Sequence, residues 1–310
     1  MSAVHQIEFG VGGLTLSAVA GEPSGECRGA LLALHGGGAR AAYWDSPVSS
    51  ADSLVRLASE LGWRVLAPDR PGYGASYGIG LDTGAQAELV EQVVATWLES
   101  EAAAIPETPV VVVGHSLGAI VALRVAARAR IGGLAGVAVG GVPLLYTKQQ
   151  TLGLRSAITD GVHLRHERPL EARKVSPGDW YGPAGSFDER ILEFRGDLVS
   201  STPSAEFVDA RDAPDLLPRL MRDISVPVQW AVAEHELTTA PSGELLTAAQ
   251  SHLRRAASVD YVTVRGSGHN LSLGGRARSY HLRVLAFAEA ARASFLGAGS
   301  SFSNNVKAVS

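Results

Sequence analysis

The chain contains the stretch Val110-Val111-Val112-Val113-Gly114-His115-Ser116-Leu117-Gly118, in which four valines run into a Gly-x-Ser-x-Gly motif. An unbroken apolar run of this kind is typical of a strand buried on both faces of a sheet. The residues that follow, Leu117–Ala129, have the composition of a helix. A strand, a sharp turn and a helix are the context in which this motif presents a serine as a nucleophile. The stretch therefore predicts a nucleophilic Ser116.

The turn around Ser116 requires small residues on both sides. The residues two before and two after the serine face the neighbouring strand and helix, where a Cβ atom would collide, and they are Gly114 and Gly118. The start of the following helix would favour negative charge that develops near Ser116. Taken alone, the five-residue motif is also compatible with a glycine-rich turn that holds a buried structural serine.

Strand and helix patterns alternate outward from this stretch. The expected strands are Ile7–Phe9, Leu14–Ala20, Ala30–Leu34, Arg64–Ala67, Val110–Val113, Leu134–Val139, Val226–Ala233 and Val259–Val264. The expected helices are Leu54–Leu61, Ala85–Leu98, Leu117–Ala129, Gly243–Ala256 and Ala277–Ala293. Glycines between the first two strands favour a hairpin. This alternation predicts an α/β fold with a mainly parallel sheet flanked by helices.

One long segment interrupts the alternation. Residues 145–215 are polar, rich in proline, glycine and charge, and weakly periodic. We interpret them as a cap inserted over the carboxyl ends of the strands, where sites form in such sheets. The core then comprises residues 1–144 and 216–296. Residues 297–310 are small and polar, and we expect a disordered tail there.

Four segments resemble the α/β-hydrolase superfamily, in the same order along the chain. They are His35-Gly36-Gly37-Gly38-Ala39, Asp69–Ser76, Gly114–Gly118 and Gly266-Ser267-Gly268-His269, and the likeness spans most of residues 1–295. The resemblance implies the α/β-hydrolase fold, with nucleophile, acid and base following one another in that order.

The resemblance also implies roles for individual residues. His269, in the loop after the Val259–Val264 strand, takes the place of the general base. The oxyanion hole is expected from the backbone N–H groups of Leu117 and Gly37, with Gly38 as the next candidate. His115, inside the motif, is expected to be structural, with substrate contact as the alternative.

The acid that orients the base is expected after the Val226–Ala233 strand, which ends in Glu234-His235-Glu236. The family usually has aspartate at the position that matches Glu236. Some relatives take the acid from the loop after the Leu134–Val139 strand, but here that loop contains no carboxylate. Glu236 is therefore the predicted acid and Glu234 the alternative, and a surface Glu236 without a catalytic part stays open. Asp209 and Asp212 are further candidates.

Other residues are candidates for contact with the substrate. Tyr73 follows a strand in a turn-rich loop, and Trp180 and Tyr181 lie in the cap. The cap also has a basic stretch, made of Arg155, His163, Arg165, His166, Arg168, Arg173 and Lys174. It could bind an anionic substrate or the phosphate of a carrier, or be a solvated helix face. His163 and His166 are spaced as on a polar helix face, so we expect no metal site.

Composition limits the classes of function. The chain has 310 residues, 46% of them hydrophobic, and a net charge of -4 without a long basic run, which argues against a nucleic-acid partner. The single cysteine, Cys27, requires no oxidising compartment. Residues 1–8 lack the features of a signal peptide, and no apolar run reaches the ~18 residues of a membrane span. We expect a cytoplasmic protein with no membrane contact and no cofactor, and the sequence leaves its oligomeric state open.

A serine nucleophile in this family implies cleavage of an acyl ester, thioester or lactone of a small molecule through an acyl-enzyme on Ser116. It argues against haloalkane dehalogenase and epoxide hydrolase chemistry, which this fold carries out with aspartate. Acyl transfer, cyclisation and elimination reuse the same residues and remain alternatives. A non-catalytic small-molecule receptor on the same fold is a further alternative.

Overall fold

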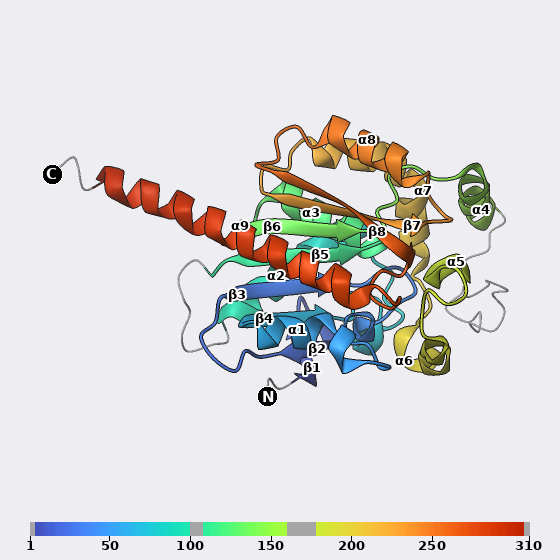
Figure 1. The fold of residues 1–310 in the computed structure, drawn as a ribbon, viewed down its shortest axis with the longest axis horizontal. Helices are drawn as coiled ribbons and strands as arrows, with labels where there is room; N and C mark the ends of the chain where they lie inside the picture. The colour runs from blue at the N-terminus through green and yellow to red at the C-terminus, as the bar shows by residue number, and fades with distance from the viewer. Residues whose placement is uncertain (1–3, 100–107, 160–177, 307–310) are drawn as a thin grey trace.

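The computed structural model describes residues 4–99, 108–159 and 178–306. Within these residues the centre is a sheet of eight strands in the order β1-β2-β4-β3-β5-β6-β7-β8 (Figure 1). β1 (Val4–Val11) and β2 (Leu14–Gly21) form the expected antiparallel hairpin, and β2 is also antiparallel to β4. Every pairing from β4 to β8 is parallel. The expected α/β fold is confirmed.

The eight expected strands are all present. The parallel ones are β3 (Gly29–Leu34), β4 (Trp63–Pro68), β5 (Val110–His115), β6 (Leu134–Gly140), β7 (Val228–His235) and β8 (Val259–Gly268). The helices that cover the sheet are α1 (Leu54–Glu60), α2 (Thr83–Glu99), α3 (Leu117–Arg128), α8 (Ser242–His252) and α9 (Ala277–Val306). Short helical turns lie in the loops at η1 (Ala41–Trp44), η2 (Ser50–Asp52) and η3 (Gly74–Ser76).

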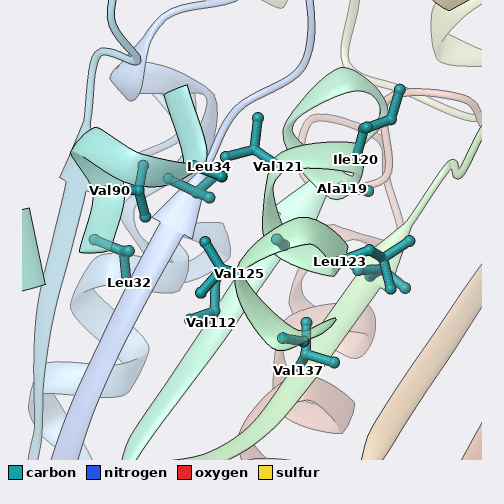
Figure 2. Packing of buried hydrophobic residues seen from close by; sticks show 14 of the residues in the cluster. Leu32, Leu34, Val90, Val112, Ala119, Ile120, Val121, Leu123, Val125 and Val137 are labelled. Carbon is teal, nitrogen blue, oxygen red and sulfur yellow. The ribbon is translucent and has the colours of Figure 1, made fainter. Parts of the chain in front are cut away.

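Apolar side chains fill both faces of the sheet. Val110 and Val112 of β5 belong to the cluster that packs against α2 and α3, whereas Val111 and Val113 belong to the cluster against α1 and α9. Figure 2 shows Val112 and Val137 of the sheet beside Leu123 and Val125 of α3. The four valines of β5, Val110 to Val113, are all fully buried, as the unbroken apolar run predicts.

The segment between β6 and β7 is a cap-like helical insertion. Its described elements are α4 (Lys148–Thr159), α5 (Gly178–Tyr181), η5 (Glu189–Phe194), α6 (Arg195–Leu198) and α7 (Ser204–Met221). The expected end of the cap at residue 215 falls inside α7, which continues past it despite Pro214 and Pro218. Leu217 and Met221 are fully buried in the cluster that also contains α3, so the last turns of α7 pack with the core. Because proline is unusual inside a helix, Pro214 and Pro218 kept the sequence pattern from indicating that α7 continues past residue 215.

The C-terminal segment differs from the expected tail. α9 continues from Ala277 to Val306, and its last turns project beyond the sheet (Figure 1). Each glycine in a helix costs about 1 kcal/mol relative to alanine, but no proline stops the helix after Gly297. Residues 307–310 lie outside the described ranges. Among the helices that the structure describes, α9 included, none combines the length and apolarity needed to cross a membrane.

Candidate active site

Ser116 occupies a sharp turn between β5 and α3. Its backbone has φ 52° and ψ -118°, a positive φ that a side chain normally disfavours. The turn is held by hydrogen bonds from Ser116 N–H to Gly140 O (2.9 Å) and from Ala119 N–H to Ser116 O (2.9 Å). Backbone strain of this kind persists where the surroundings enforce it, and it is typical of a serine presented as a nucleophile.

The two glycines of the motif are required by close backbone contacts. A Cβ atom on Gly118 would overlap the carbonyl oxygens of Leu34 and His35 in β3 and the loop after it. A Cβ atom on Gly114 would lie 2.7 Å from Gly118 O. The strand, the turn and the helix therefore approach one another as closely as the small residues in the sequence predict.

This contact yields a test of the turn. We expect Gly118→Ala to lower the free energy of unfolding by about 1–3 kcal/mol or more, because backbone rather than a flexible side chain must move. Gly153→Ala is the matched control, since a Cβ atom on Gly153 in α4 meets nothing within 4 Å. Urea unfolding of both variants measures the difference. Equal stability of the two variants would contradict the close packing at Gly118.

His269 and Glu236 lie at the ends of neighbouring parallel strands. β7 ends at His235 and β8 at Gly268, and these two residues are paired in the register of the sheet. The residues that follow the two strands, Glu236 and His269, therefore lie at the same edge of the sheet. His269 Nδ1 lies 2.7 Å from Glu236 Oε2, and both side chains are almost fully buried.

The second carboxylate oxygen of Glu236 is also occupied. Oε1 accepts hydrogen bonds from the hydroxyl of Thr238 (2.9 Å) and from its backbone N–H (3.3 Å). Burial by itself would raise the pKa of Glu236, but the interactions with His269 and Thr238 outweigh it and lower the pKa below its ordinary value. Glu236 is therefore ionised at neutral pH and holds the His269 ring by Nδ1.

None of the alternative acids contacts His269. Glu234 accepts a hydrogen bond from Gly266 N–H (2.7 Å) and is half exposed. Asp209 accepts one from Thr83 N–H, and Asp212 pairs with Arg211. Among these carboxylates, the one that contacts His269 is thus Glu236.

Ser116 and His269 line one cavity of about 280 Å³ beneath the cap. Gly36, Gly37 and Gly38 form part of its wall. Gly38 N–H donates to Tyr73 Oη (3.3 Å), whereas the N–H groups of Gly37 and Leu117 have no acceptor among the described residues. Gly37 and Leu117 lie close together: a Cβ atom added to Gly37 would come 2.5 Å from Leu117 Cδ1. This pair of N–H groups can act as donors to an oxyanion.

Three aromatic residues expected near the substrate do line the cavity. The His115 ring stacks on Tyr43 (4.7 Å between centroids), and burial keeps its pKa well below the ordinary value, so the ring is neutral. Trp180 meets the His269 ring edge-on at 5.2 Å. Tyr181 is buried beside it.

Tyr73 does not line the cavity, so the prediction that it contacts the substrate is wrong. The side chain is fully buried behind the loop of Gly36, Gly37 and Gly38, which we call the glycine loop. Its hydroxyl donates to Glu206 Oε2 (2.7 Å) and accepts from Gly38 N–H. The loop that carries Tyr73 turns under the glycine loop instead of over the cavity. Tyr73 therefore supports the loop from behind.

Other parts of the cavity wall were missed in the sequence. They come from the cap and the nearby loops and include Tyr146, Leu154, Arg195, Phe207, Thr239 and Asn270. The weak periodicity of residues 145–215 contains no signal that singles them out. Of the basic cap residues noted in the sequence, Arg155 is exposed on α4, and the others, His163 and His166 included, lie outside the described residues. No cluster of three or more metal-ligating side chains occurs in the described part of the chain.

Comparison with known proteins identifies the family. Residues 31–280 match the family model described as the alpha/beta hydrolase family. The chain belongs to the alpha/beta hydrolase family. Comparison with curated protein sequences gives no significant match. The family accounts for the mainly parallel sheet and for the sharp turn after β5.

Solved structures show the same fold at low identity. An esterase from Thermogutta terrifontis, with malate bound, is 18% identical at a TM-score of 0.66 and covers 93% of this chain and 99% of its own. A thioesterase domain from the curacin biosynthetic pathway is 16% identical at 0.62, covering 91% and 99%. The epoxide hydrolase CorEH is 19% identical at 0.63, covering 92% and 98%. These hydrolases differ in their substrates, so the likeness extends to the fold alone.

Proposed function

We propose that this alpha/beta hydrolase cleaves an acyl ester, thioester or lactone of a small molecule through an acyl-enzyme on Ser116. The observation that carries the proposal is the 2.7 Å contact of the Glu236 carboxylate with His269 Nδ1, in a cavity that Ser116 also lines. A carboxylate on Nδ1 leaves the other ring nitrogen, Nε2, as the proton acceptor. A serine rather than an aspartate at the turn favours acyl chemistry over epoxide opening. A cytoplasmic location is part of the proposal.

The proposed reaction has two halves. His269 Nε2 takes the proton of Ser116 as Oγ attacks the carbonyl carbon, and the resulting oxyanion accepts hydrogen bonds from Gly37 and Leu117 N–H. Collapse breaks the bond to the leaving alcohol or thiol, which receives the proton from His269. A water molecule then loses a proton to His269 and attacks the acyl carbon. Collapse of this second intermediate breaks the bond to Ser116 Oγ, which takes the proton back from His269, and the acid is released. Oxyanion donors of this kind contribute several kcal/mol to stabilising the transition state.

Labelling tests the nucleophile directly. A fluorophosphonate should phosphonylate the chain once, and peptide mass spectrometry should locate the adduct on Ser116. Ser116→Ala should give no adduct. An adduct on another serine, or none on correctly folded protein, would overturn the proposal.

A panel of acyl esters, thioesters and lactones tests the reaction class. Hydrolysis predicts release of the free acid, whereas acyl transfer or cyclisation predicts incorporation of the acyl group into a second product. Tight binding without turnover, together with no labelling of Ser116, would instead indicate a receptor.

A further inference from the structure

Arg195 is an exposed residue that also lines the cavity, to which it brings a positive charge. Among the described residues that line it, Arg195 is the one Arg or Lys side chain, and no aspartate or glutamate is among them. Its guanidinium forms no hydrogen bond or ion pair within the described part of the chain, although Glu193 and Asp197 are close in sequence. By contrast, Arg190 on the same segment is paired with Asp188 at 2.5 Å. Among the described residues, therefore, no carboxylate neutralises the Arg195 charge.

The backbone of Arg195 is anchored to the core. It begins α6, and the apolar side chains on either side, Ile191 and Leu198, are buried. Arg195 O accepts the N–H of Val199 (3.0 Å), which closes the turn. The backbone of Arg195 therefore belongs to a short helix that packs against the core.

The same segment is bonded to the glycine loop. Arg40 N–H donates to Leu198 O (3.0 Å), and Ser200 N–H donates to Gly38 O (2.9 Å). These bonds set the position of α6 relative to the N–H of Gly37, the proposed oxyanion donor. The backbone of Arg195 is therefore held in place relative to the proposed oxyanion donor, and its side chain can reach a group on a substrate whose carbonyl lies at that donor.

The surroundings of Arg195 are suited to an anion with an apolar stem. Tyr181 lines the same cavity as Arg195, and burial raises the pKa of its hydroxyl. Much of the remaining wall is apolar, with Leu154, Phe207 and Leu273 among its residues. Planar guanidinium groups bind carboxylate and phosphate oxygens in pairs.

We infer that the substrate carries an anionic group, a carboxylate or a phosphate, that binds Arg195 while its acyl carbonyl lies at Ser116. The inference rests on the proposed hydrolase function and names its substrate class. It differs from binding by the basic stretch at residues 163–174, because Arg195 lies on an anchored helix and lines the same cavity as Ser116.

Matched substrates test the inference. The carboxylate pair is mono-p-nitrophenyl glutarate and p-nitrophenyl pentanoate, which have the same acyl length, with spontaneous hydrolysis subtracted. The phosphate pair is the pentanoyl thioester of coenzyme A and that of N-acetylcysteamine. Each pair gives a ratio of kcat/KM, anionic over neutral. We expect wild type to favour the anionic member of at least one pair, and Arg195→Gln to reduce that ratio by about 10–100-fold.

Control variants make the result specific. Arg195→Lys should retain part of the preference, because it keeps the charge and loses the paired geometry. Arg190→Gln removes an exposed arginine from the same segment outside the cavity and should leave both ratios unchanged. The wild-type preference should also weaken as salt is added.

The outcomes separate the inference from the hydrolase proposal. A reduced ratio in the glutarate pair alone identifies a carboxylate, and a reduced ratio in the coenzyme A pair alone identifies a phosphate. Ratios that are the same in wild type and Arg195→Gln, with Ser116 labelled and both members cleaved, would overturn the inference alone. No turnover of any substrate and no labelling of Ser116 would instead overturn the proposed function.

Discussion

Glu236→Gln is expected to lower kcat by about 10²–10⁴-fold with a much smaller change in KM. Glu236 contacts His269 Nδ1 at 2.7 Å and is held by two further hydrogen bonds from Thr238. An amide at this position cannot stabilise the imidazolium that forms during the reaction, and its NH₂ group favours the tautomer in which Nε2 carries the proton. Steady-state kinetics on the first good substrate measure the effect.

Glu234→Gln is the matched control, because Glu234 lies two residues away and bonds to Gly266 instead of His269. It should retain nearly full activity. The double variant Ser116→Ala/Glu236→Gln should be no worse than Ser116→Ala, since groups that act as one unit do not give additive losses. Collapse of activity in Glu234→Gln, with Glu236→Gln near wild type, would refute the assignment of the acid.

Glu206→Gln is expected to lower the free energy of unfolding by about 3–5 kcal/mol. Arg70 Nη1 and Glu206 Oε1 form an ion pair at 2.6 Å in which both side chains are fully buried. Glu206 also accepts hydrogen bonds from Tyr73 Oη (2.7 Å) and from the Gln86 amide (2.6 Å). Removing its charge leaves the buried guanidinium without a counter-ion, and the cost is large because water cannot replace the partner.

The same ion pair connects the cap to the glycine loop. Glu206 belongs to α7, while Arg70 Nε donates to His35 O (2.7 Å) at the start of the loop. Urea unfolding measures the loss, with Arg190→Gln as a control at an exposed ion pair that should show no measurable change. A Glu206→Gln variant as stable as Arg190→Gln would contradict a structural role for the buried pair.

Much of this fold was predictable from the sequence, since its signals are local. Four successive valines require a strand buried on both faces, and the glycines on each side of Ser116 allow a turn that places strand and helix in contact. α7 and α9 extend past the bounds that the sequence pattern indicated, because two prolines in α7 and small polar residues in α9 are weak helix signals.

The candidate site, like the fold, was predictable from the sequence only in part. The sequence by itself determined the α/β fold, the turn at Ser116 and the position of His269 after the last strand, because each depends on residues adjacent in the chain. Glu234 and Glu236 are equivalent in local pattern, and the sequence favoured Glu236 only by resemblance to the family. The pairing of His235 with Gly268 decides which carboxylate reaches His269. The burial of Tyr73 beneath the glycine loop and the position of Arg195 on the cavity wall were likewise decided by tertiary structure. Both depend on contacts between segments more than a hundred residues apart, for which the sequence contains no periodic signal.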